Sequence, residues 1–226
     1  MPLKFSPGEI RNAYTRRVPY ADHWVVNITP HDIFKAYTRS SGDYLFIWIN
    51  KTAGVSIARA LGINKDTYNH YTATELRGIL GEITFDKLFK FCVVRNPWDK
   101  VVSEFRFRVW TCQNELNSNS SFSEWVRSTY VEHDPQYYDW PKMFLPQLEW
   151  ITNENGEIIV DFVGRFESLQ DDFEQICDRL NIKCRLLCHE NKSRNHTGYR
   201  DYYNGETKSI VESCFKADIE FFGYKF

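Results

Sequence analysis

The sequence predicts an α/β fold, in which a single domain has a central, mostly parallel sheet flanked by helices. Two continuous apolar runs, residues 44–49 and 89–94, have the β-branched and aromatic composition of strands that are covered on both faces. A segment of helical composition follows each run, and strands that alternate with helices form parallel sheets. The chain has 226 residues and neither an internal repeat nor a linker, so we expect one domain over residues 1–226.

The first predicted unit is a strand, a loop and a helix. The strand at 44–49 leads through the polar residues 50–54 into a helix over 55–61, which ends at Gly62 because glycine favours the residue after a helix. A polar stretch then leads to a helix predicted at 74–80.

The second unit repeats this pattern from residue 89. Pro97 is suited to the first turn of a helix and Asn96 to its N-cap, so the strand at 89–94 leads into a helix that runs to about Val109. After it we expect a loop at 114–121 and helical segments at 122–128 and 145–151.

The remaining elements are a third strand and two helices. The Asn155-Gly156 pair predicts a turn before a strand at 157–163. An amphipathic helix at 167–181, a polar loop at 190–200 and a last helix from about Glu206 follow, while the Pro-punctuated segment 1–43 contains a short helix near 31–38.

The overall charge and hydropathy exclude several classes of protein. With 28 Lys and Arg against 30 Asp and Glu, the net charge of −2 argues against a nucleic-acid partner. No apolar run is long enough to span a membrane, and the N-terminal residues have no apolar core of a signal peptide. We therefore expect a soluble, cytoplasmic protein with no membrane partner.

The six cysteines do not form a metal-binding pattern. Cys184 and Cys188 lack a second nearby pair, so we expect no metal, and in a cytoplasmic setting we expect reduced thiols. The aromatic content is high at 16%, which is enough for a core and for part of a cleft. The aromatic stretch 130–144 is a candidate wall for a ring-shaped ligand.

The loop after the first strand has the features of an anion site. Lys51 precedes Thr52, Ala53 and Gly54 at the start of a helix, where backbone N–H groups and the helix dipole favour a phosphate-like group. The Walker A pattern is missing, because the lysine begins the loop instead of closing it. The alternative is an ordinary turn with a solvated lysine.

The loop after the second strand offers another basic group. Arg95 follows the strand directly, and Ser103 lies on the next helix, so both can converge on one anion. In the alternative interpretation, Arg95 pairs with Asp99 or Glu104 and Ser103 has no such role.

Together, residues 51–56 and 94–103 resemble the two signatures of PAPS-dependent sulfotransferases of the carbohydrate type, the heparan sulfate 2-O-sulfotransferase-like family. The resemblance continues over residues 160–167 and 191–224, so that it covers 44–226 and leaves 1–43 as a variable segment. Asn50 and Val55 depart from the family pattern, which usually has proline and a hydroxyl residue at these positions.

The resemblance implies a donor site for PAPS (3′-phosphoadenosine 5′-phosphosulfate), with PAP as the product. A P-loop-like phosphosulfate-binding loop would then use the catalytic Lys51, and Arg95 with Ser103 would hold the 3′-phosphate. A basic loop near the C-terminus would fold over the donor. The remaining donor-binding candidates are Thr52, Ala53, Gly54, Val55, Ser56, Ile57, Lys192, Ser193 and Arg194.

The reaction implied is in-line transfer of a sulfuryl group from PAPS to a hydroxyl, or as a second choice an amine, of a carbohydrate or small-molecule acceptor. Such a reaction needs a general base, and the position of His70 makes it the first candidate, with His196 and Glu104 as substitutes. Two other functions stay open: a nucleotide-dependent phosphotransferase on a P-loop-like scaffold, and a non-catalytic nucleotide-binding module.

Overall fold

The computed structural model describes residues 44–63, 70–184 and 198–226. The predicted helix near 31–38 and the candidates Lys192, Ser193, Arg194 and His196 lie outside these ranges.

Within the described residues the sheet has three parallel strands in the order β1-β2-β3. They are β1 (Tyr44–Ile47), β2 (Phe89–Val94) and β3 (Phe162–Arg165). Because Tyr44 pairs with Phe89, and Phe91 pairs with Phe162, all three carboxyl ends meet at one edge of the sheet. The predicted parallel α/β architecture is confirmed, and this edge holds the candidate site.

The third strand was predicted too early, at 157–163. The carbonyl oxygen of Glu157 accepts a hydrogen bond from the Asn153 amide, and Ile158 forms an antiparallel bridge with Thr152, so this segment closes a turn. Gly156 has a φ of 80°, which suits glycine in that turn. The apolar residues after the turn have the composition of a strand, but β3 begins only at Phe162.

Except for α5, which was not predicted, the helices lie close to the predicted segments. The boundaries are α3 (Gly54–Leu61), α4 (Ala73–Leu80), α5 (Glu82–Lys87), α6 (Pro97–Trp110), α7 (Phe122–Tyr130), α8 (Leu169–Arg179), α9 (Gly205–Cys214) and α10 (Lys216–Phe222). Two corrections follow. The segment predicted as helical at 145–151 forms a 3-10 turn, Gln147–Trp150, and the single C-terminal helix is broken at Phe215 into α9 and α10.

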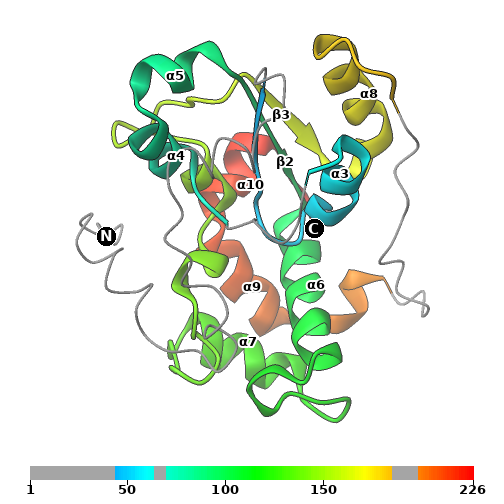
Figure 1. Ribbon diagram of the computed structural model, residues 1–226. Helices are drawn as coiled ribbons and strands as arrows, with labels where there is room; N and C mark the ends of the chain where they lie inside the picture. The colour runs from blue at the N-terminus through cyan, green and yellow to red at the C-terminus, as the bar shows by residue number, and fades with distance from the viewer. Residues whose placement is uncertain (1–43, 64–69, 185–197) are drawn as a thin grey trace.

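Helices cover both faces of the sheet, as Figure 1 shows for α3 and α8 on one side and for α4 and α5 on the other. Alternate residues of β1 explain this arrangement, since Leu45 and Ile47 join one apolar core and Tyr44 and Phe46 join the other. The first core packs against α4, α6, α7 and α9, and the second against α3 and α8.

None of the helices in the described ranges is long and apolar enough to cross a membrane. The cysteines in these ranges, Cys92, Cys112, Cys177, Cys184 and Cys214, form no disulfide with one another.

Candidate functional site

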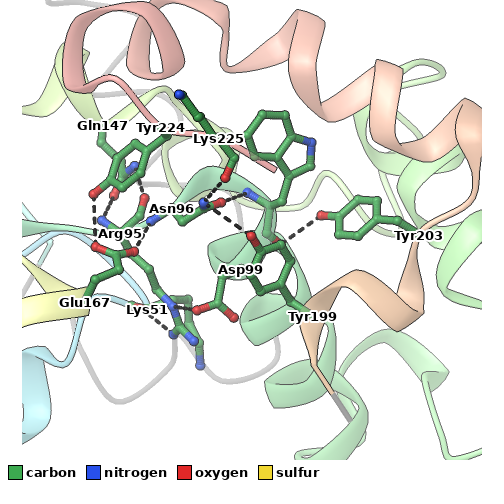
Figure 2. Close-up of polar contacts among 11 residues, drawn as sticks. Lys51, Arg95, Asn96, Asp99, Gln147, Glu167, Tyr199, Tyr203, Tyr224 and Lys225 are labelled. Atoms are coloured by element: carbon green, nitrogen blue, oxygen red, sulfur yellow. Dashed lines mark hydrogen bonds and ion pairs between the residues drawn. The ribbon is translucent and has the colours of Figure 1, made fainter.

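The two loops identified in the sequence lie together at the carboxyl edge of the sheet. One guanidinium nitrogen of Arg95, Nη1, donates a hydrogen bond to the carbonyl oxygen of Lys51 at 3.0 Å. Figure 2 shows these two side chains projecting in the same direction from neighbouring loops. The parallel topology therefore brings together residues that are 44 positions apart in the sequence.

The loop between β1 and α3 has a specific backbone shape. Lys51 and Ala53 have left-handed φ values of 64° and 68°, which only a well-determined loop imposes on residues other than glycine. Thr52 is fully buried, and its hydroxyl donates to the carbonyl oxygen of Ile49 at 2.9 Å. The Thr52 hydroxyl therefore helps to shape the loop.

Position 54 requires glycine because its backbone lies close against the Trp48 side chain. A Cβ atom at position 54 would lie 1.7 Å from the indole Nε1 of Trp48, which no side chain can tolerate. The glycine thus allows α3 to begin directly against the indole ring.

The N-terminus of α3 receives no side-chain cap from its own N-cap residue. Its N-cap residue, Ala53, makes no side-chain cap hydrogen bond, and the first turn contains no acidic residue. The amide of Ile57 already donates to the carbonyl oxygen of Ala53 at 3.1 Å, so of the amides predicted to bind an anion, residues 52–57, this one is not available. The structure therefore removes the Ile57 amide from the backbone groups predicted to bind the donor.

The Lys51 ammonium lies over the ring of Phe107, 3.9 Å from its centroid. Burial lowers the pKa of Lys51 to about 8; the Glu104 carboxylate acts against this shift, while neighbouring cations such as Arg95 add to it. Lys51 is consequently a cation at neutral pH, and an anion placed beside it would raise its pKa.

Glu104 is the buried carboxylate among these cations. It accepts hydrogen bonds from Arg108 Nε at 2.9 Å and from Asn50 Nδ2 at 3.3 Å. Burial by itself would raise the pKa of Glu104, but Lys51, Arg108 and Lys100 hold it below its ordinary value. Because these cations lower its pKa, the Glu104 carboxylate has little tendency to accept a proton, which makes it a weak candidate for the general base and a strong counter-charge for Lys51.

Asn50, which stands where the resembled family has proline, links the loop to Glu104. Its Nδ2 makes the contact with Glu104, while its buried Oδ1 has no hydrogen-bond partner among the described residues. The side chain thus replaces the conformational restriction of proline with a polar attachment to α6.

Arg95 pairs with Asp99, as the alternative interpretation of the sequence predicted. Its Nε lies 2.8 Å from Asp99 Oδ2, and its guanidinium stacks on the Phe166 ring at 3.9 Å. Ser103 is four residues beyond Asp99 and four before Phe107, so it lies on the α6 face that these two residues present to Arg95 and Lys51. Arg95 therefore contacts the first loop, and Ser103 shares the α6 face that carries Asp99 and Phe107.

In the loop between β2 and α6, side chains of the protein accept hydrogen bonds from the backbone amides. The Asn96 side chain caps α6 by accepting from the Trp98 amide at 3.1 Å, as predicted. The Asn96 amide donates to Glu167 at 2.7 Å, and the Arg95 amide donates to Gln147 at 2.8 Å. Figure 2 shows this network, in which Tyr224 also contacts Glu167.

His70 lies at the end of β1, where its Nδ1 is 2.9 Å from the carbonyl oxygen of Trp48. Since a carbonyl only accepts, Nδ1 carries the proton and the lone pair of the neutral ring is on Nε2. Burial lowers the pKa of His70, although the Trp48 hydrogen bond and the Glu104 charge act in the opposite direction. His70 is thus neutral at pH 7, and Glu104 influences both this ring and Lys51.

The sequence model of the sulfotransferase family matches residues 34–225, which is most of the chain. The chain belongs to the sulfotransferase family. An uncharacterized protein of Archaeoglobus fulgidus is 31% identical over 110 residues, which cover 47% of this chain and 79% of that protein.

Several residues that organise this candidate site were not identified from the sequence. The Trp48 indole leaves no room for a side chain at Gly54, and the Trp48 carbonyl contacts His70. The Gln147 side chain bonds both the amide and the carbonyl of Arg95. The Glu167 carboxylate accepts a hydrogen bond from the Asn96 amide. Gln147 had only a weak signal, as a polar residue in the mainly apolar segment 143–151, and it is fully buried in the structure. In the described ranges no cluster of three or more His, Cys, Asp or Glu side chains could hold a metal ion.

Proposed function

We propose that this sulfotransferase uses PAPS as its donor and transfers the sulfuryl group to an acceptor hydroxyl, with an amine as the second choice. One observation carries the proposal: Arg95 contacts the Lys51 carbonyl, so a basic pair lies at the uncapped N-terminus of α3. PAPS carries a 3′-phosphate and a 5′-phosphosulfate on one ribose, so it needs two neighbouring cationic positions of this kind.

The described residues fit such a donor. The backbone amides from Thr52 to Ser56 and the Lys51 ammonium are suited to the phosphosulfate. A guanidinium has five N–H donors, and the contacts with Asp99 and the Lys51 carbonyl use two of those of Arg95, which leaves three for a 3′-phosphate. Ser103 would add a hydroxyl there, and Lys192, Ser193 and Arg194 remain candidates to cover the donor.

In the proposed reaction, the bond from sulfur to the bridging phosphate oxygen breaks while the acceptor oxygen forms a new bond to sulfur. Lys51 stabilises the negative charge that develops on the leaving phosphate oxygen. Nε2 of His70 accepts the proton of the acceptor hydroxyl and later releases it to solvent. The hydrogen bond from Nδ1 to Trp48 keeps the His70 ring oriented for this step.

The donor assignment is tested by calorimetry with PAP, ADP and AMP. We expect PAP to bind at least about tenfold more tightly than either of the others, because a charge-assisted contact to the 3′-phosphate contributes about 1.5–3 kcal/mol. Equal affinities for the three nucleotides would contradict the proposal.

The role of His70 is tested with His70→Ala. We expect transfer from labelled PAPS to fall by about 10²–10⁴-fold, because general base catalysis contributes that much, while PAP affinity stays within about twofold. A variant with nearly normal transfer would show that another group is the base.

A further inference from the structure

The ring of His70 is surrounded by indole rings. The ring centroids of Trp48, Trp140 and Trp150 lie 5.7, 6.3 and 6.2 Å from that of His70, all in edge-to-face geometry. Trp48 and Trp150 are buried, whereas Trp140 is 41% exposed. Of these three rings, a ligand can therefore reach Trp140 without displacing the protein.

Ion pairs hold Trp140 in place from both sides. In the preceding residue, Asp139, Oδ1 lies 2.8 Å from Arg108 Nη2. Two residues after Trp140, Lys142 Nζ lies 2.6 Å from Glu75 Oε1. Lys142 also donates to the carbonyl oxygen of His70 at 3.2 Å, which ties the Trp140 segment directly to the His70 backbone. The exposed indole is thus a fixed surface beside the proposed base, and its exposure does not result from a loose loop.

These ion pairs also determine the charge next to Trp140. Arg108 is neutralised by Glu104 and Asp139, and Lys142 by Glu75. In the described part of the chain, the cations on either side of the indole are therefore already compensated. A polyanionic chain would find little attraction here, whereas an uncharged ring would lose little solvation by stacking on the indole.

We propose that Trp140 is the stacking surface for the acceptor, and that the acceptor is an uncharged ring bearing a hydroxyl, such as a neutral sugar or a phenol. Stacking on the indole would place a ring hydroxyl beside His70. The inference rests on the proposed function, because it takes His70 as the base. It excludes a sulfated or carboxylated glycosaminoglycan as the preferred acceptor.

Labelled PAPS and four acceptors test the proposal: a methyl glucoside, a methyl galactoside, a simple phenol and a sulfated heparan oligosaccharide. We expect transfer to at least one neutral ring, and the sugar and phenol arms identify its source. Trp140→Ala should raise the acceptor KM by about tenfold, equivalent to about 1.4 kcal/mol, with kcat changed less than about twofold. Trp140→Phe should recover most of the loss, because it restores a ring.

The matched control is Trp110→Ala, since Trp110 is a 76% exposed indole at the end of α6. We expect this variant to keep the wild-type KM. Equal KM values for the two alanine variants, or a preference for the heparan oligosaccharide, would overturn the inference.

Direct binding of the neutral rings, measured by saturation-transfer NMR without PAPS, separates this inference from the proposed function. Binding that is lost in Trp140→Ala and kept in Trp110→Ala supports the stacking surface, even where no sulfuryl transfer is observed. Binding that is equal in both variants, or absent from the wild-type protein, overturns it.

Discussion

The loops after β1 and β2 have similar sequence patterns but different environments. Each follows a buried strand, carries a basic residue and begins a helix. In the first loop the helix N-terminus has no side-chain cap, whereas in the second Asn96 caps α6 and Asp99 lies in its first turn. A strand, a basic residue and a helix therefore do not by themselves make an anion site; the site also depends on whether the protein has already satisfied the helix amides.

The second loop supports the first. Its backbone groups are held by Gln147 and Glu167, which makes it a rigid base for the Arg95 side chain. Arg95 then reaches across to the Lys51 carbonyl. We infer that the β1–α3 loop binds the donor mainly through backbone amides, and that the β2–α6 loop contributes only the side chains of Arg95 and Ser103.

Of the effects expected at the two loops, the largest is at the first. Lys51→Ala removes the cation beside the leaving oxygen, so we expect transfer from labelled PAPS to fall on the order of 10²–10³-fold. The matched control is Lys225→Ala, because Lys225 is exposed and contributes only its backbone carbonyl to this network. If both variants retain wild-type turnover, Lys51 has no catalytic role.

A smaller effect is expected on stability at the second loop. Asn96→Ala removes the α6 cap and the hydrogen bond to the Lys225 carbonyl, so we expect the free energy of unfolding to fall by about 1–2 kcal/mol. Ser121→Ala is the control, because it removes the cap of the exposed α7 N-terminus with no such additional contact in the described residues. Urea denaturation that gives equal losses for both would show that the contact with the C-terminal segment contributes nothing.

The smallest effect is the pH dependence of PAP affinity. Lys51 has a pKa of about 8, and bound phosphate would raise it, so binding takes up a proton once the pH exceeds about 8. Calorimetry should therefore show affinity falling roughly tenfold between pH 7.5 and 9.5. Stability should respond in the opposite direction, because the unfolded chain holds this proton more tightly between pH 8 and 10.5 and Lys51 then favours folding as the pH rises.

The control for this pH profile is Lys51→Ala, whose PAP affinity should be lower and nearly constant over the same range. A variant that keeps the wild-type slope would assign the titration to another group.

Local signals in the sequence account for much of the fold. The apolar runs predicted β1 and β2, and Asn96 with Pro97 predicted the start of α6. The sequence could not predict the start of β3, because the apolar residues after Gly156 have strand composition, whereas the hydrogen bonds within 153–158 form a turn. The hydrogen bonds of this local turn outweighed the strand preference of its apolar residues.

The same division applies to the candidate site. Lys51 and Arg95 were identified because each follows a buried strand and precedes a helix, and the structure places the Arg95 guanidinium in contact with the Lys51 carbonyl oxygen. The pairing of Glu167 with Asn96 joins residues 71 positions apart, and no local pattern specifies such a contact. The compensation of Arg95 by Asp99 was visible as an i, i+4 pair, but its presence could not be distinguished from a ligand-binding role by spacing alone.

Trp48 has a consequence for how relatives of this protein can vary. Its indole fills the space beside Gly54, and its carbonyl orients His70, so one residue contacts both the β1–α3 loop and the proposed base. A relative with a smaller residue at position 48 could accept a side chain at position 54, whereas a change at position 54 alone is barred. We therefore expect positions 48 and 54 to change together in divergent members, which makes this pair a marker of how closely another member shares this site.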